Sequence, residues 1–366
     1  LHPEKIFGGI TTALVVFSEL QNHLNDYFDY RIISITDPVQ MNSMRRFPEY
    51  RLISSDSVID NFPKTIIDAS EGSIANISIR RNDIFLATAW WTATCAYDFQ
   101  TDIASYHDVS LPILYFIQDH EPDFFGWSTE YAEARSTYTH HGKKICLINS
   151  EELAEYMMQH YNFDDAYMIP FSINNKIKTS LKSVAKERII LIYGRPGTSR
   201  NCFAKIINAL YQWQQIDPIE AERWRIVSAG ECYPEGRTFH VSNLEIVGKM
   251  PLQEYAEMLS KASVGISLMV SPHPSYPPLE MAYAGLHTIA NDFESKNLSV
   301  RSPLITSVDD ITDESLVEAL MNCVASANLS IGNVVIPPSL EAPRCSVPTY
   351  NAKFMADRLR KLVGTL

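Results

Sequence analysis

Residues 271–285 read SPHPSYPPLEMAYAG, and they follow a short apolar run at residues 264–268. An apolar run of this length is typical of a buried strand, and the apolar spacing from Leu279 onward is typical of a helix. The prolines between the two stiffen the loop, because a proline ring fixes its own φ angle. The stretch therefore predicts a strand, a rigid loop and a helix, the repeating unit of a parallel α/β sheet.

Short apolar runs alternate with amphipathic helices over most of the chain, which predicts parallel sheets with crossover helices. Further strands are expected at residues 31–35, 83–88, 112–117, 144–148, 166–169, 189–193, 225–229, 244–247 and 286–290. A helix is expected at 151–160, after the cap Asn149-Ser150. Three more helices are expected to bury the apolar faces Ala13, Leu14, Phe17 and Leu20; Phe203, Ile206, Ile207, Leu210 and Trp213; and Phe354, Met355, Leu359, Leu362 and Val363.

The polar stretch at 170–188 interrupts this alternation and predicts an interdomain linker. We expect an N-terminal acceptor-binding domain at 1–172, a C-terminal donor-binding domain at 187–348, and a C-terminal helix at 349–366 that packs back on the N-terminal domain. Both domains are expected to be doubly wound and Rossmann-like, facing each other across a cleft. Only six residues precede Phe7-Gly8-Gly9, so the opening strand expected there is missing and the sequence is expected to begin late.

The composition narrows the classes of partner. The chain has 366 residues, of which 46% are hydrophobic and 20% charged, and its formal net charge is −12. An acidic surface repels phosphate backbones, so nucleic acid is not expected as a partner. No apolar stretch approaches the ~20 residues of a membrane span, and no signal peptide is evident. We expect a cytoplasmic protein that meets a lipid-linked acceptor at the inner face of the membrane.

Neither the cysteines nor the histidines form a metal-binding pattern. The six cysteines are scattered without a CxxC pair, which favours free, mostly buried thiols in a reducing compartment. Of the ten histidines only His140 and His141 are close, and there is no HExxH motif. No metal or other cofactor is expected.

Glu280 lies where the loop enters the helix, and two interpretations are open. A helix start offers free backbone N–H groups to an anion, which favours a ligand site. Alternatively, Glu280 simply caps the helix dipole.

A second loop, 193–201, follows a predicted strand and opens a helix. Gly194 and Gly197 would let the backbone approach a diphosphate, while Arg195 and Arg200 would clamp its oxygens. The loop lacks the Gly-Lys-Ser/Thr of a Walker A motif. The alternative is a surface loop with solvated arginines.

These two segments resemble the retaining glycosyltransferases of family four, which have the GT-B fold. Pro277-Pro278-Leu279-Glu280-Met281-Ala282 with Gly285 resembles the donor-site signature, and Gly194-Arg195 with Arg200 resembles the element that holds the donor diphosphate without a metal. The resemblance implies that Glu280 binds the sugar ring of the nucleotide. An earlier glutamate of the family, which touches the transferred sugar, is replaced here by Pro272.

The resemblance implies further donor contacts. Gly230 would lie beneath the nucleotide, and Lys249-Met250 would meet the base through the backbone. His273, Ser275 and Tyr276 would face the transferred sugar. Near the N-terminus, Gly8, Gly9 and Thr11 resemble the glycine loop that approaches phosphate or acceptor, although a Gly-Gly pair is also common in plain turns.

Two aromatic and acidic segments follow predicted strands in the first half of the chain. Sugars stack on aromatic rings while carboxylates bind their hydroxyls, so Trp90, Trp91 and Trp127 beside Asp119 and Glu121 suit an acceptor site. Asp119, with His120 and Glu121 beside it, would orient or deprotonate the acceptor hydroxyl. Core packing of one tryptophan and a solvated acidic loop are the alternatives.

Nearly the whole chain resembles the bacterial rhamnan-synthesis glycosyltransferases of surface-layer glycan assembly. That resemblance implies transfer of L-rhamnose from dTDP-L-rhamnose to a growing rhamnan chain, with retention of configuration. Two other classes stay open: a nucleotide-sugar epimerase of the same fold, and a non-catalytic glycan-binding protein.

Overall fold

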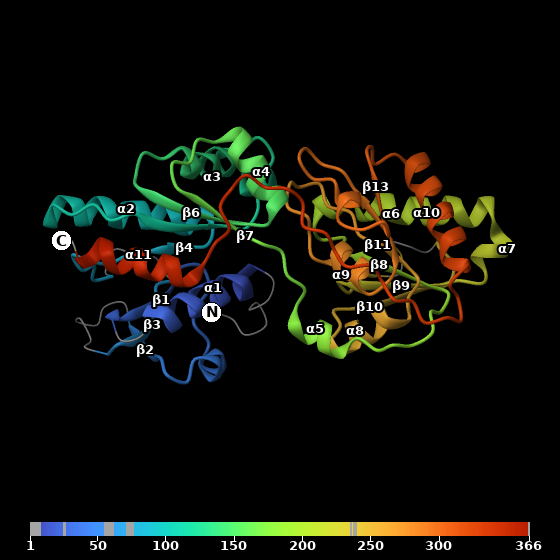
Figure 1. Ribbon diagram of the computed structural model, residues 1–366, viewed down its shortest axis with the longest axis horizontal. Helices are drawn as coiled ribbons and strands as arrows, with labels where there is room; N and C mark the ends of the chain where they lie inside the picture. Colours follow the sequence, from blue (N-terminus) through green and yellow to red (C-terminus); the bar gives the residue numbers. More distant parts are fainter. Residues whose placement is uncertain are drawn as a thin grey trace. The chain divides into compact units, whose positions relative to one another are not determined.

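The computed structural model describes residues 9–24, 27–54, 62–70, 77–234, 236 and 240–364 (Figure 1). The chain forms two compact units. Unit 1 comprises Leu1–Asn149, Tyr161–Ile169 and Val347–Leu366, and unit 2 comprises Ser150–His160 and Pro170–Ser346. Gly8, predicted to belong to the N-terminal glycine loop, lies outside the described residues.

Unit 2 is built on a six-stranded parallel sheet. Its strands are β8 (Ile189–Gly194), β9 (Arg225–Gly230), β10 (Leu244–Gly248), β11 (Val264–Ile266), β12 (His287–Asn291) and β13 (Ile305–Val308). Their spatial order is β10-β9-β8-β11-β12-β13, with every neighbouring pair parallel. This order reverses between β8 and β11, and ligands of doubly wound sheets bind at the carboxyl ends of the strands at such a point.

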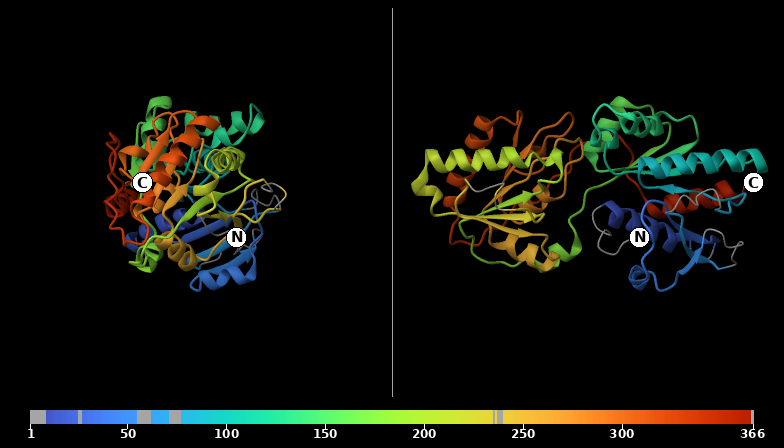
Figure 2. Two further views of the ribbon diagram at one scale, coloured as in Figure 1. Left: turned by 90° about the vertical axis from the view of Figure 1, so that its right-hand side faces the viewer. Right: turned by 180° about the vertical axis from the view of Figure 1, so that it is seen from behind.

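Helices cover both faces of this sheet (Figures 1 and 2). The helices of unit 2 are α4 (Glu151–His160), α5 (Asn175–Ser180), η5 (Ser199–Asn201), α6 (Phe203–Ile216), α7 (Pro218–Ala221), α8 (Leu252–Lys261), α9 (Pro277–Tyr283), η7 (Leu298–Val300) and α10 (Asp313–Asn328). Along β8, Ile190 and Ile192 pack with α6 and α10, whereas Ile189 and Leu191 pack with α8 and α9. Because alternate side chains of a strand point to opposite faces, a strand buried on both sides reads as one apolar run.

Unit 1 contains two parallel sheets. One has the order β4-β5-β6-β7 and the other β1-β3-β2. The strands are β1 (Tyr30–Ser34), β2 (Arg51–Ser54), β3 (Lys64–Asp68), β4 (Leu86–Ala87), β5 (Ile113–Ile117), β6 (Lys144–Asn149) and β7 (Ala166–Ile169). The helices are α1 (Gly9–Leu24), η2 (Met41–Arg46), α2 (Trp90–His107), η4 (Glu121–Phe124), α3 (Thr129–Thr139) and α11 (Ala352–Gly364).

The predicted α/β class with parallel sheets is confirmed, and several details differ. The predicted strand at 83–88 is reduced to β4, and the short strands β2, β3 and β13 have no counterpart in the prediction. Trp90 and Trp91 begin α2 instead of ending a strand. The C-terminal helix α11 packs against α1 through Met355, Ala356 and Leu359, whereas Phe354 is exposed.

A buried ion-pair cluster explains why α4 belongs to unit 2. Arg301 donates from Nε and Nη2 to the two oxygens of Glu152, at 2.8 and 2.9 Å, and from Nη2 to Glu151 at 2.7 Å. All three side chains are almost fully buried. A buried charge is costly unless it is paired, so the ion pairs keep Glu151 and Glu152, and with them α4, beside Arg301.

Among the described residues, no helix combines the length and the hydropathy needed to cross a bilayer.

Candidate functional site

The two predicted donor motifs meet at the carboxyl edge of the unit 2 sheet. One motif follows β8 and the other follows β11, and these strands are neighbours at the point where the strand order reverses. The loops are joined by hydrogen bonds. The Val270 amide donates to the Arg200 carbonyl at 2.8 Å, and Asn201 Nδ2 donates to the Leu268 carbonyl at 3.0 Å. The structure therefore brings Arg200 and the segment before Glu280 into one site.

Glycines allow the backbone to pack closely at this edge. A Cβ atom on Gly194 would collide with Ser228 Oγ, and one on Gly230 would lie 2.5 Å from the Gly194 carbonyl oxygen. Gly230 also has a φ of +142°, which side chains rarely adopt. A third close approach joins Gly248, which precedes Lys249 and Met250, to Cys232. The loops after β8, β9 and β10 thus lie side by side.

The loop after β8 already binds an anionic group of the protein itself. Glu231 accepts one hydrogen bond from Arg195 Nε at 3.1 Å and one from the Gly197 amide at 2.8 Å. These are the arginine and the loop backbone predicted to hold a diphosphate. The Glu231 carboxylate thus meets the donors that were predicted to bind phosphate oxygens, and no motif in the sequence indicated this contact.

Buried polar side chains hold the loop after β11. Asn291 accepts from the Met269 amide at 2.7 Å and donates to the Met269 carbonyl at 3.1 Å. Lys296, whose side chain is fully buried, donates to the same carbonyl. Neither residue was predicted to belong to the site, because both come from the β12 side of the sheet.

Glu280 carries a buried carboxyl group at the start of α9. Burial raises its pKa to about 7, and the neighbouring Tyr255 hydroxyl opposes that shift. Pro277 and Pro278 have no N–H groups, so the first turn of α9 offers few donors to cap. None of the hydrogen bonds found in the described part of the chain joins the Glu280 side chain to the amides of α9. The Glu280 carboxylate is therefore not a hydrogen-bonded cap, although its place in the first turn of α9 still suits the helix dipole.

The segment predicted to face the sugar is tightly held. His273 Nδ1 accepts from the Ser275 amide at 3.0 Å, and the ring centroid of Tyr276 lies 5.7 Å from that of His273. Ser275 has a φ of +65°, a left-handed conformation that is unusual for a residue other than glycine. Such strain is concentrated at functional sites.

In unit 1, the acidic cluster after β5 is not a solvated loop. Asp119, His120 and Glu121 are all buried. Glu121 accepts from the Trp90 amide at 2.6 Å and so satisfies a donor at the start of α2. Burial raises the pKa of Glu121 to about 8; the Trp90 amide opposes this shift, and the charge of Asp119 adds to it.

Both ring nitrogens of His120 are occupied within the protein. Nδ1 lies 2.7 Å from an Asp123 oxygen, and Nε2 lies 2.7 Å from the Tyr161 hydroxyl. The ring also stacks on Tyr138. This arrangement fixes the orientation of His120. Asp119 is held as well, since its Oδ1 accepts a hydrogen bond from the His120 amide at 2.9 Å.

The predicted acceptor aromatics separate into packed and exposed rings. Trp90 packs edge-on against Trp91 and Phe125. Trp91 is 37% exposed and Trp127 is 94% exposed, so these two rings are available for stacking. Gly9 and Thr11 lie in the first turn of α1, where a Cβ atom on Gly9 would collide with the Gln118 side chain just after β5.

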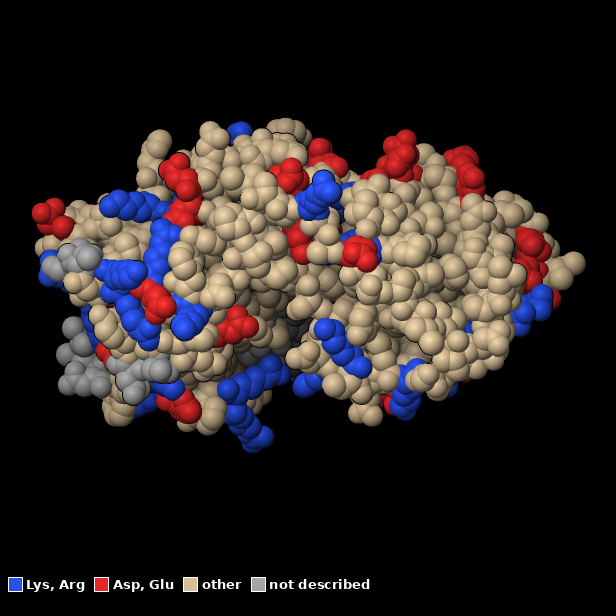
Figure 3. Space-filling model, in the orientation of Figure 1, with Lys and Arg blue, Asp and Glu red and all other residues tan. Residues whose placement is uncertain are grey.

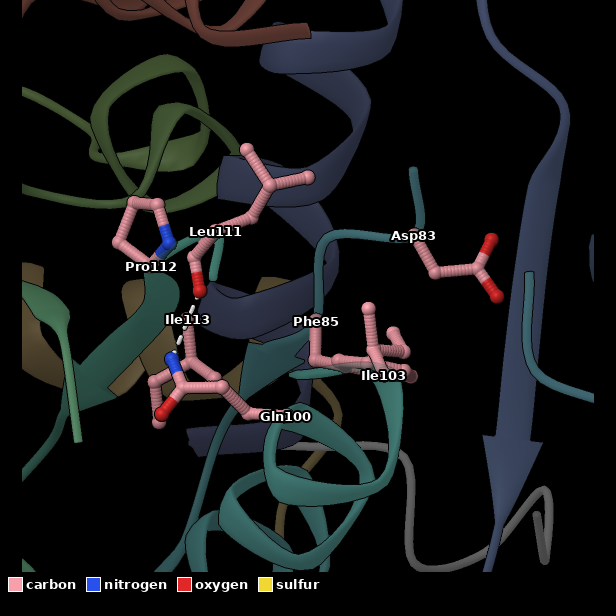
Figure 4. A pocket seen from close by; sticks show the side chains of 7 residues that line it. All are labelled: Asp83, Phe85, Gln100, Ile103, Leu111, Pro112 and Ile113. Carbon is pink, nitrogen blue, oxygen red and sulfur yellow. Dashed lines mark hydrogen bonds between the residues drawn. The ribbon is translucent and has the colours of Figure 1, made fainter. Parts of the chain in front are cut away.

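A small pocket elsewhere in unit 1 is too small to hold a sugar. Figure 4 shows its lining, which includes Gln100, Leu111 and Ile113, and its volume is about 10 Å³. Ile113 is the first residue of β5, so the pocket lies at the opposite end of that strand from Asp119. Within the described residues, no three His, Cys, Asp or Glu side chains are grouped as ligands for a metal ion.

Solved structures with the same arrangement define the class. Sucrose-phosphate synthase from Thermosynechococcus elongatus superposes with a TM-score of 0.57 and 12% identity, over 98% of this chain and 89% of that chain. TarM from S. aureus, in complex with UDP, Fondaparinux and alpha-GlcNAc-glycerol, superposes with a TM-score of 0.50 and 8% identity, over 77% of this chain and 52% of that chain. The chain has the GT-B fold.

The family follows from the sequence comparisons. Residues 1–151 match the N-terminal domain of WsaF, and residues 188–321 match its C-terminal domain. The chain belongs to the WsaF family. The O-antigen biosynthesis protein RfbC of Myxococcus xanthus is 30% identical over 217 residues, which are 57% of this chain and 16% of that relative. This chain therefore spans only a small part of the length of RfbC.

Proposed function

We propose that the protein transfers L-rhamnose from dTDP-L-rhamnose to a growing rhamnan chain, with retention and without a metal. The observation that carries the donor assignment is the Glu231 carboxylate, bound by Arg195 and the Gly197 amide. A loop that holds one oxyanion by an arginine and a backbone N–H has the donors that phosphate oxygens need. The rhamnosyl identity of the donor rests on the family resemblance.

In this proposal the carboxyl edge of the unit 2 sheet holds the donor. Arg195 and Arg200 neutralise the diphosphate, Gly230 lies beneath the nucleotide, and the backbone of Lys249 and Met250 meets the base. Glu280 accepts a hydrogen bond from the nucleotide's sugar ring. The transferred sugar lies against His273, Ser275 and Tyr276, and Pro272 replaces the hydroxyl-binding glutamate of the family. Tyr276 would then cover the methyl group of a 6-deoxy sugar.

The residues after β5 serve the acceptor in this proposal. Asp119 orients or deprotonates the acceptor hydroxyl. Glu121, with its pKa raised to about 8, is mostly neutral at pH 7 and suits a hydrogen-bond donor better than a base. His120 is a positioning residue, while Trp91 and Trp127 stack on acceptor sugars with Gly9 and Thr11 nearby. A lipid-linked acceptor would be met at the inner face of the membrane.

A transfer assay tests the proposal. The protein is incubated with dTDP-L-rhamnose, with and without a fluorescently tagged rhamnose oligosaccharide, in the presence of EDTA. We expect the tagged oligosaccharide to gain one deoxyhexose, whose NMR spectrum shows the same anomeric configuration as the donor sugar, and we expect no conversion of the donor sugar when the oligosaccharide is left out. Asp119→Asn should lower turnover and leave the dissociation constant for dTDP nearly unchanged.

Three outcomes contradict parts of this proposal. Conversion of the donor sugar without acceptor would indicate an epimerase. An inverted anomer would remove the retaining mechanism, and strict dependence on added magnesium or manganese would remove the role given to the two arginines.

A further inference from the structure

Glu231 occupies the anion position formed by Arg195 and the Gly197 amide. Its two carboxylate oxygens are held separately, one by Arg195 Nε at 3.1 Å and the other by the Gly197 amide at 2.8 Å. We propose that Glu231 is a built-in competitor of the diphosphate, which holds this anion position in the free protein and leaves it when the donor binds. This inference rests on the proposed function, because it assumes that the donor phosphates use Arg195 and Gly197.

The geometry lets the side chain leave without moving the strand. The backbone amide of Glu231 donates to the Gly194 carbonyl at 2.9 Å, so the main chain is fixed beside β8. The side chain itself is 32% exposed, and its ion-pair partner Arg195 is 34% exposed. Rotation of the Glu231 side chain toward solvent therefore needs no rearrangement of the core.

Gly197 makes the anion position possible. A Cβ atom at this residue would lie 2.8 Å from Glu231 Oε2 and 3.4 Å from its carboxyl carbon. The missing side chain is what allows an oxyanion to reach the Gly197 amide, whether it comes from Glu231 or from a phosphate. Two anions cannot both hold this position, because like charges repel at contact distance.

The competition has a functional consequence. A ligand must supply enough negative charge to displace a carboxylate that is already paired, which favours a diphosphate over a singly charged group. The same carboxylate can return when the sugar has been transferred, which favours release of the nucleoside diphosphate. Glu231 would therefore weaken donor and product binding together.

A purely structural role for Glu231 gives the opposite prediction. If its carboxylate only orients Arg195 for the phosphates, its removal should weaken diphosphate binding. The sign of the change in affinity thus separates the two roles.

Isothermal titration calorimetry with inorganic pyrophosphate and with dTDP tests the inference on the full chain. Glu231→Gln keeps the size of the side chain but removes its charge, and Glu231→Ala removes the competing group altogether. Glu245→Gln is the matched control, since Glu245 pairs with Arg225 at the opposite end of the same sheet. Exposed ion pairs contribute about 0.2–1 kcal/mol, so both Glu231 variants should bind the two probes more tightly than wild type, by a factor between about 1.4 and 5. The control should not differ from wild type.

Unchanged or weaker binding of pyrophosphate by both Glu231 variants would overturn the inference. That result can be told apart from failure of the proposed function. If no variant binds dTDP but the Glu231 variants bind pyrophosphate more tightly, the competing role stands and the nucleotide assignment fails.

Discussion

The carboxyl group of Glu280 combines burial with a position beside the predicted nucleotide, and its pKa of about 7 follows from burial. Such a group changes charge in the neutral pH range, whereas an ordinary glutamate is fully ionised there. Only the ionised form gives a charged acceptor for a sugar hydroxyl. The protonation state of this single residue should therefore be visible both in stability and in donor binding.

Glu280→Gln should remove the pH dependence that Glu280 contributes to stability and to donor binding. Because the folded pKa is raised above that of the unfolded chain, the contribution of Glu280 to stability is greatest below about pH 4.5 and falls as pH rises toward 7, by up to about 1.4 kcal/mol per pH unit. When urea unfolding is measured at several pH values, the free energy of unfolding of the variant should not show this decrease between about pH 4.5 and pH 7. In calorimetry, wild type should bind dTDP more tightly at pH 8 than at pH 6, and the variant should bind it more weakly at pH 8 by on the order of 1.5–3 kcal/mol.

Glu245→Gln supplies the control for both measurements, because that carboxylate is exposed and lies at the other end of the sheet. A wild-type affinity for dTDP that does not change between pH 6 and pH 8, or a Glu280→Gln variant that binds as wild type does, would contradict the role given to Glu280.

At the scale of elements, the site depends on how closely β8 and β9 approach each other. Gly194 pairs with Gly230 across the two strands, and Ser228 fills the space that a side chain on Gly194 would need. Ser228 Oγ also accepts a hydrogen bond from the Tyr233 hydroxyl at 2.7 Å. The loop that carries Arg195 begins directly after this contact.

Gly194→Ala should destabilise the protein by about 1–3 kcal/mol, since its new methyl group collides with Ser228 Oγ. Ser228→Ala removes that oxygen and leaves its own Cβ 3.3 Å from the new methyl group. The double variant should therefore regain most of the stability lost in Gly194→Ala, and a double-mutant cycle from urea unfolding measures this coupling. Additive losses would show that the two strands do not meet through these side chains.

The elements that could be predicted are those with a local signal. The buried strands of unit 2 appear as apolar runs, and the apolar face of α6 from Phe203 to Trp213 is buried as predicted. The short strands β2, β3 and β13 carry no such run, because each has only four or five residues with polar ones among them. The helix that begins at Trp90 was not predicted, because its start is stabilised by Glu121, a partner 31 residues away along the chain.

For the candidate site, the sequence indicated the motifs and not their partners. The loops at 193–201 and 271–285 could be predicted because parallel strands end at one edge of a sheet. Glu231, Asn291 and Lys296 could not, because their contacts depend on which strands are neighbours. The same holds for Arg301, whose partners Glu151 and Glu152 lie about 150 residues away along the chain.

On the scale of the whole molecule, the chain crosses between the two units several times. Unit 2 takes α4 from within the first half of the sequence, and unit 1 takes α11 from its end. On the face shown in Figure 3, basic and acidic side chains are interspersed over unit 1, and unit 2 presents a large uncharged area.

The central claim is that the carboxyl edge of the unit 2 sheet binds a thymidine diphosphate donor through its arginines and not through a metal. Calorimetric titration of dTDP, UDP and GDP into the full chain in EDTA tests it directly, with Arg200→Ala as the site variant and Arg225→Ala as the control. We expect dTDP to bind most tightly, Arg200→Ala to weaken this binding about tenfold or more, and Arg225→Ala to leave it unchanged. Binding of dTDP that is lost in EDTA, that is weaker than binding of UDP or GDP, or that is equal in wild type and Arg200→Ala would contradict it.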